Sequence, residues 1–277
     1  MCPSSNAHDA TLVHVWIQDH ALKGGVITPE GLENIAKHKY KAGISTHLDN
    51  FLNDGWNALT ELLPLWLAPN MVTSIGGFFM IFSHLLIWCY TPNWDQDIPS
   101  WVLVVSGLCI LIYYTLDCMD GKQARRTGAS SPLGQLFDHG IDCISCFIQM
   151  STAGAFTLSG GDSGGKGLLA IQAVLQYLFY MAQWEEYYTH VLQHANGDYF
   201  GITEVNYGMG MFVLFSAFID NKVFWGTLLV TRLDIIMKIT KYWFFLVYPL
   251  LFCLNYHRRF QLLKSEKSKN IVQYFCD

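Results

Sequence analysis

From Met71 onward the chain is dominated by apolar runs that are too long for the core of a soluble protein. A helix needs about 20 consecutive apolar residues to cross the hydrocarbon layer of a bilayer. The six candidate segments are 71–90, 100–119, 135–158, 167–183, 207–219 and 233–256. The fifth is short, and its apolar stretch could continue through 223–230. We therefore predict an all-α polytopic membrane helix bundle with about six transmembrane helices.

The composition agrees with this fold class. Charged residues make up 14% of the chain and hydrophobic residues 52%, whereas an average soluble domain has about 25% charged residues. The net charge is -5, with 17 lysine and arginine residues. This balance excludes a disordered chain and gives little support to a protein that binds the phosphate backbone of a nucleic acid. We expect no nucleic-acid partner.

The polar segment 1–66 ends in an amphipathic pattern that starts near Ser45. Its apolar residues recur at helical spacing and are Leu48, Phe51, Leu52, Leu59, Leu62 and Leu63. A core-facing helix has the same pattern, but the spans that follow favour a helix at the bilayer surface. We predict a cytosolic segment 1–66 with this interfacial helix, a transmembrane core 67–257 and a basic cytosolic tail 258–277.

The distribution of basic residues predicts the orientation. With six spans and a cytosolic N-terminus, most lysines and arginines fall on the cytosolic side, including Lys122, Arg125 and Arg126 after the second span. The basic residues within 222–241 fall on the other side and fit this scheme poorly. We expect the loop after the second span to face the cytosol and the connection 159–165 to face the lumen.

Four aspartates interrupt the apolar pattern. Asp117 and Asp120 follow the second run, and Asp138 and Asp142 lie inside the start of the third. A charge in hydrocarbon costs about 2.5–3.5 kcal/mol even on the lenient insertion scale. At 100° per residue, each pair lies on one face of its helix, and the short polar connection predicts antiparallel helices with these faces opposed.

Opposed carboxylates repel one another unless cations lie between them. Oxygen ligands favour a hard ion, and two Mg²⁺ or Mn²⁺ ions would balance four carboxylates and leave positions for a pyrophosphate. A proton or cation pathway in a transporter is the alternative reading of the carboxylates alone.

The residues around the aspartates form a longer pattern, DxxDGxxAR(x8)GxxxDxxxD. It runs from Asp117 to Asp142 and includes Gly121, Ala124 and Arg125. Eight fixed positions match by chance with odds of order 10⁻¹⁰. By this pattern the chain resembles the CDP-alcohol phosphotransferase family. From about residue 35 to 206, including HKYKAG and WLAPNMVTSIG, it is similar to the eukaryotic choline/ethanolamine phosphotransferases.

The resemblance implies roles for particular residues. The metal ligands, for two ions of Mg²⁺ or Mn²⁺, would be Asp117, Asp120, Asp138 and Asp142. Asn70, Gly121 and Arg125 would bind the CDP-alcohol, and His139 would be the catalytic base. Members of this family usually continue through about ten spans, whereas about six are predicted here. A homodimer is also implied.

The position of His139 supports its role independently. It adjoins Asp138 and lies about 60° round the helix from Asp142, at the border of the carboxylate face. An alcohol that attacks phosphorus needs a base that works near neutral pH, and histidine meets this requirement. A hydrogen-bonded structural histidine is the alternative.

Two features near the end of the fourth span are ambiguous. The WEEYY string at 184–188 could hold a quaternary ammonium group through its aromatic faces and a carboxylate, or form an interfacial aromatic belt. His190 and His194 are spaced four apart like a metal pair, but no third ligand is evident, so a solvated loop face is favoured.

The predicted function is transfer of phosphocholine and/or phosphoethanolamine from CDP-choline or CDP-ethanolamine to diacylglycerol, which releases CMP. The expected location is the membrane of the endoplasmic reticulum or Golgi, with the site facing the cytosol. The alternatives are another alcohol acceptor in the same family, an ion-coupled transporter, and a truncated, inactive partner of a full-length enzyme.

Overall fold

The protein is described from a computed structural model. The described residues are 40–94, 96–156, 164–195 and 197–220, with Thr28, Glu30, Gly31, Glu33 and Ile35. Contacts divide the chain into two units, and every helix with described bounds lies in the first, Met1–Phe218. The predicted sixth span, the 223–230 extension, the basic tail and most of the 159–165 connection lie outside the described residues.

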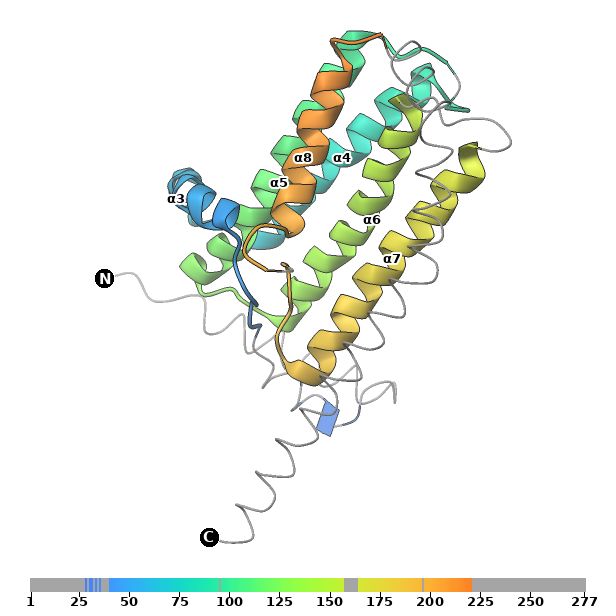
Figure 1. Cartoon of the computed structure of the whole chain (residues 1–277). Helices are drawn as coiled ribbons and strands as arrows, with labels where there is room; N and C mark the ends of the chain where they lie inside the picture. Colours follow the sequence, from blue (N-terminus) through green and yellow to red (C-terminus); the bar gives the residue numbers. More distant parts are fainter. Residues whose placement is uncertain are drawn as a thin grey trace, which may run out of the picture. The chain divides into compact units, whose positions relative to one another are not determined.

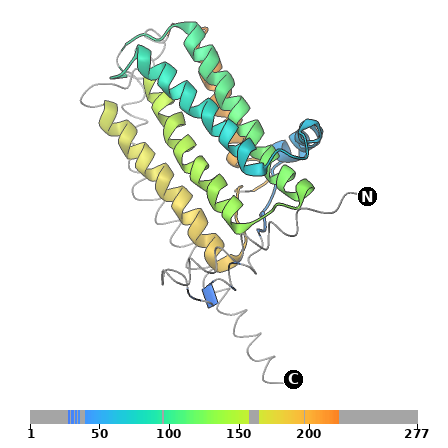
Figure 2. The same cartoon turned by 180° about the vertical axis from the view of Figure 1, so that it is seen from behind.

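The described part of the chain is all-α, and its extended segments form only isolated bridges. The helices are α3 (His47–Leu62), α4 (Pro69–Tyr90), α5 (Ser100–Thr127), α6 (Pro132–Phe156), α7 (Gly164–Thr189) and α8 (Ile202–Ser216). Helix α5 packs against α4 and α8, α4 also packs against α6, and α6 carries α7 on its other side (Figures 1 and 2).

Helices α4 and α5 are long and apolar enough to cross a membrane, by length and composition. Small and polar residues of α4 face the neighbouring helices: Thr73, Gly76, Gly77 and Ser83 are buried. Large apolar side chains of α4 face outward instead, and they are Met71, Ile75, Phe78, Ile81, Phe82, Leu85 and Trp88. Small residues inside and large apolar residues outside are typical of helix packing in a bilayer.

Close approach between the long helices depends on glycine. A methyl group placed on Gly77 would lie 3.2 Å from Cγ2 of Ile141 in α6, and one on Gly107 would lie 2.7 Å from Cγ of Leu214 in α8. These two positions bring α4 against α6 and α5 against α8, which brings the aspartate-bearing ends of α5 and α6 to their common neighbour α4.

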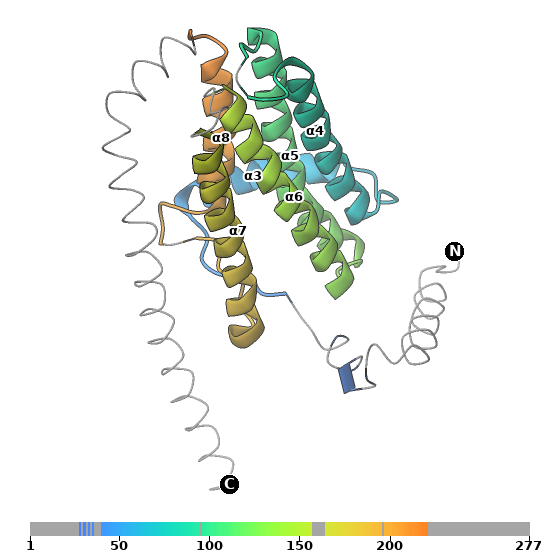
Figure 3. The same ribbon diagram turned by 90° about the vertical axis from the view of Figure 1, so that its right-hand side faces the viewer.

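Helix α3 runs crosswise to the long helices (Figure 3). A capping box between Thr46 and Asp49 starts it. Trp56 and Thr60 are the buried residues of α3, and Nζ of Lys122 in α5 donates to Oδ1 of the exposed Asn53 and Asn57 at 2.6 and 2.7 Å.

Part of the apolar face of α3 points outward. Phe51 is 80% exposed and Leu62 79% exposed, whereas Trp56 on the inner side is buried. Large apolar side chains of α3 are therefore left uncovered by the described part of the protein.

Helices α4 and α6 match the predicted spans 71–90 and 135–158 to within three residues, whereas α7 ends six residues later and α8 begins five residues earlier than predicted. The largest difference is in α5, which does not end at residue 119. It continues to Thr127 and is terminated by Gly128 in a left-handed conformation, with φ of 68°. The polar extension stays helical because its side chains bind α3 and the α3–α4 connection. Arg126 Nη1 donates to the carbonyls of Thr60 and Leu63 at 2.9 and 2.8 Å.

Candidate metal and nucleotide site

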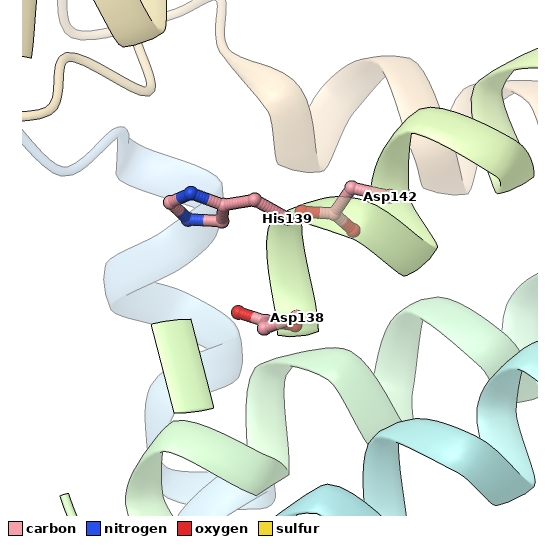
Figure 4. A group of neighbouring side chains, drawn as sticks. All are labelled: Asp138, His139 and Asp142. Carbon is pink, nitrogen blue, oxygen red and sulfur yellow. The ribbon is translucent and has the colours of Figure 1, made fainter. Parts of the chain in front are cut away.

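The structure brings the four aspartates together in two overlapping groups. One carboxylate oxygen each from Asp117, Asp120 and Asp138 lie within 4.8 Å of one another. A second group of the same size joins Asp138 and Asp142 to a ring nitrogen of His139 (Figure 4). Asp138 belongs to both groups. The arrangement therefore offers two adjacent cation positions that share one carboxylate.

Neighbouring hydroxyl groups orient two of the carboxylates. Tyr113 of α5 donates to Oδ1 of Asp142 at 2.6 Å, and the Thr73 hydroxyl of α4 donates to Oδ2 of Asp120. Each bond holds one oxygen of its carboxylate in place. Neither hydroxyl was singled out from the sequence.

The remaining oxygens fit a divalent cation. Among the described residues, no hydrogen-bond partner reaches Oδ1 of Asp117 or Oδ1 of Asp138, although both atoms are buried. A buried carboxylate oxygen without a partner is costly. Asp117 also lies close enough to the other three carboxylates to be repelled by each. Hard oxygen ligands with a negative charge and no competing donor suit Mg²⁺ or Mn²⁺.

The residues expected to bind the nucleotide lie beside this group. A methyl group on Gly134 at the start of α6 would lie 3.6 Å from Oδ1 of Asn70, and one on Gly121 would lie 3.6 Å from Nη1 of Arg125. Both glycines thus leave room next to a polar side chain. Arg125 is exposed.

A polar scaffold holds the entrance to α4. Nε2 of Gln123 donates to the carbonyls of Pro64 and Leu67, each at 3.0 Å. This fixes the α3–α4 connection, and with it Asn70 at the start of α4, against the end of α5. This role of Gln123 was not predicted from the sequence.

His139 points toward α7. Its Nδ1 lies 3.1 Å from Oε1 of Gln183, and its ring meets that of Phe179 edge to face, with centroids 6.5 Å apart. His139 therefore has one nitrogen engaged by α7, while the ring also borders Asp138 and Asp142.

Residues 40–43 and 192–194 form a layer next to His139. The segment before α3 is tied to the α7–α8 connection, since the Gly43 amide donates to the Leu192 carbonyl at 2.8 Å and the Leu192 amide donates to the Lys41 carbonyl at 3.0 Å. The Tyr40 hydroxyl lies 3.2 Å from Nε2 of His194. The prediction of a solvated loop face is therefore wrong for His194. His190 follows the end of α7 and is exposed.

The electrostatics of this layer favour neutral groups. Burial and the nearby Glu186 carboxylate raise the pKa of Tyr40, so its hydroxyl stays protonated. Burial and the neighbouring His139 lower the pKa of His194, so its imidazole stays neutral. Tyr40 can then donate to Nε2 of His194.

The WEEYY string is divided between two environments. Glu186 is buried and its Oε1 accepts from Nε2 of Gln135 at 2.7 Å, whereas Trp184 and Tyr187 are exposed. The string does not form a closed aromatic cage in the described part of the chain.

Comparisons with known proteins point to one family. The model of the family CDP-alcohol phosphatidyltransferase matches residues 66–233. Choline/ethanolaminephosphotransferase 2 of Arabidopsis thaliana is 40% identical over 169 residues, which cover 61% of this chain and 42% of that protein. Cholinephosphotransferase 1 of Xenopus laevis is 34% identical over 205 residues, or 74% of this chain and 48% of that protein.

Ethanolaminephosphotransferase 1 of Homo sapiens is 35% identical over 176 residues, which cover 60% of this chain and 44% of that protein. The chain thus spans about half the length of the curated relatives it matches. The family match covers more than half of the chain and contains all four aspartates, and it confirms the resemblance inferred from the signature. The chain belongs to the CDP-alcohol phosphatidyltransferase family.

Proposed function

We propose that the protein transfers phosphocholine and/or phosphoethanolamine from CDP-choline or CDP-ethanolamine to diacylglycerol. The hydroxyl oxygen of diacylglycerol forms a bond to the phosphorus that carries the alcohol, and the bond from that phosphorus to the bridging oxygen breaks. CMP leaves with that oxygen, and the hydroxyl proton goes to a base. The products are phosphatidylcholine or phosphatidylethanolamine and CMP.

The observation that carries this proposal is the pair of carboxylate groups that share Asp138. Asp117, Asp120 and Asp138 would hold one divalent ion, and Asp138 and Asp142 the other. When bound, two Mg²⁺ or Mn²⁺ ions would offset the negative charge of the pyrophosphate and of departing CMP. Tyr113 and Thr73 orient the carboxylates for this role.

The nucleotide would be held by residues beside the carboxylates. Arg125 offers a planar fork to a phosphate, and Gly121 lets the nucleotide approach the backbone of α5. Asn70 offers both a donor and an acceptor at the start of α4.

His139 is the proposed base. It borders Asp138 and Asp142, so a hydroxyl that approaches the phosphorus comes within reach of its ring. A neutral imidazole takes the proton as the new bond forms, which avoids a free alkoxide.

The outer surface supports a membrane location. Large apolar side chains cover the outer face of α4, and α3 turns Phe51 and Leu62 away from the protein. We propose that α3 lies in the bilayer interface, that about six helices span the endoplasmic reticulum or Golgi membrane, and that the site faces the cytosol. The parts 1–66, 67–257 and 258–277, and the homodimer, belong to the same proposal.

The test is an assay of the purified chain in detergent with labelled CDP-choline or CDP-ethanolamine, diacylglycerol and Mg²⁺. Labelled phospholipid and an equal amount of CMP are expected. The matched control is Asp117→Asn, which keeps the shape of the side chain and removes its charge. If the label is transferred to a different alcohol, that alcohol replaces diacylglycerol as the proposed acceptor. Binding of the CDP-alcohol without transfer would favour an inactive partner, and no binding would reject the proposal.

A further inference from the structure

The interface between α6 and α7 contains three polar contacts in a row. Gln135, His139 and Cys143 recur every four residues on α6 and meet Glu186, Gln183 and Gln176 of α7 in turn. The bonds are 2.7 Å for Gln135 Nε2 to Glu186 Oε1, 3.1 Å for His139 and Gln183, and 3.1 Å for Cys143 Sγ to Gln176 Oε1. Polar contacts of this kind hold helices together in a bilayer.

The middle contact differs from the others because it engages a group next to the carboxylates. The partner of Nδ1 in His139 is the amide oxygen of Gln183, which can only accept a hydrogen bond. Nδ1 therefore carries the proton in this pair, and in the neutral ring the lone pair that can accept a proton lies on Nε2.

The same helix also fixes the plane of the ring. Phe179 lies one turn before Gln183 on α7, and its ring meets the His139 ring at an interplanar angle of 88°. A single hydrogen bond would leave the imidazole free to turn about it. The edge-to-face contact with Phe179 and the hydrogen bond to Gln183 together restrict this rotation.

We propose that Gln183 is a positioning residue that holds His139 in the tautomer with an unprotonated Nε2. This inference rests on the proposed role of His139 as the base. Gln183 acts through His139, so its loss should slow the chemical step and leave binding of the CDP-alcohol unchanged. No residue of α7 was expected to contribute to the chemistry from the sequence.

The test compares Gln183→Met with Gln176→Met. Both variants replace a half-buried glutamine of α7 by an apolar side chain of the same length. Gln183→Met removes one polar contact to α6, and Gln176→Met removes two, both to Cys143. Loss of a group that orients a reactive histidine typically costs 10- to 100-fold in activity. We expect Gln183→Met to lower kcat by about 10- to 100-fold with KM for the CDP-alcohol unchanged. Gln176→Met should keep kcat within about twofold.

A double variant separates positioning from packing. In a His139→Ala background, Gln183→Met should cause no further loss of kcat, because the residue through which it acts is gone. A helix-packing role would instead lower kcat by the same factor in both backgrounds, or lower it equally for Gln176→Met and Gln183→Met. Either result would overturn the inference.

The two proposals fail in different ways. If His139→Ala turns over at nearly the normal rate, the base is misassigned and the proposed function must be revised first. If His139→Ala is slow while Gln183→Met is normal, His139 remains the base and only the role of Gln183 is rejected.

Discussion

Tyr113 and Asp142 are joined across the α5–α6 interface by a hydrogen bond of 2.6 Å from the phenol to Oδ1. Tyr113 is buried, so the bond has little competition from water. It holds one oxygen of Asp142 in place, and in the proposed site the other oxygen would bind a cation. A ligand oriented in this way binds a metal more tightly than one that is free to rotate.

Tyr113→Phe should therefore raise the Mg²⁺ concentration needed for half-maximal activity by about 10- to 100-fold, with partial recovery at high Mg²⁺. The matched control is Tyr114→Phe. It removes an equally buried hydroxyl one residue along, whose partner is Oγ1 of Thr203 at 2.7 Å rather than a carboxylate. A shift in Mg²⁺ dependence that is equal for both variants would contradict a role for Tyr113 in orienting Asp142.

Replacement of the aspartates tests the metal site directly. Asp→Asn at Asp117, Asp120, Asp138 or Asp142 should abolish transfer without loss of membrane insertion, because each change removes a ligand charge. EDTA should silence the enzyme, and Ca²⁺ should bind but support turnover poorly. Asp54→Asn on α3 is the control. If one of the four variants keeps a near-normal rate at saturating Mg²⁺, the aspartate that it replaces is not a metal ligand.

The sequence predicted the parts of the site that depend on local geometry. Spacing placed Asp117 with Asp120 and Asp138 with Asp142 on single helix faces, and the signature identified the family. Tyr113, Thr73 and Gln183 could not be found in this way. Their partners lie 29, 47 and 44 residues away, so the contacts arise only when the helices pack.

The orientation of α3 shows the same limit. An apolar stripe is compatible with a core-facing helix and with an interfacial one. The pattern alone does not say which apolar residues of α3 are covered, and the structure buries Trp56 while it leaves Phe51 and Leu62 exposed. The end of α5 was missed for a similar reason. An apolar window ends where polar residues begin, even when the helix itself continues, as α5 does to Thr127.

Acid should weaken the layer formed by Tyr40 and His194. Burial holds the pKa of folded His194 below its usual 6.5. As the pH falls through that range, the unfolded chain takes up a proton that the folded chain does not, so stability falls with pH. Thermal unfolding from about pH 7.5 to about pH 5.5 should show this loss, and His194→Gln should reduce its slope. His190→Gln, at an exposed site, is the control and should retain the slope. Equal slopes in all three proteins would contradict the assignment.

The orientation can be tested at the two ends of α5. Asn93 lies in the exposed connection before α5, and Ser130 in the exposed connection after it. In sealed endoplasmic reticulum vesicles with the native cysteines replaced, Ser130→Cys should react with an impermeant maleimide added outside. Asn93→Cys should react only after permeabilisation. The reverse pattern would place the aspartates on the lumenal side and contradict a cytosolic supply of CDP-alcohol.

The role of His139 has two readings that one experiment can separate. Its ring nitrogen lies within 4.8 Å of carboxylate oxygens of Asp138 and Asp142, so it could be a metal ligand as well as a base. A base that is removed lowers kcat by about 10²–10⁴ and leaves metal binding intact. A lost ligand weakens metal binding, and activity then recovers as the metal concentration rises.

We expect His139→Ala to lower kcat by about 10²–10⁴ with little change in KM for the CDP-alcohol, because the aspartates, Asn70 and Arg125 still hold it. Its half-saturating Mg²⁺ concentration should match that of the unaltered protein, unlike that of Tyr113→Phe. Recovery of turnover at high Mg²⁺ would make His139 a ligand, and near-normal turnover with reduced thermal stability would make it structural. The hydroxyl proton would in both cases have to leave through a bound water.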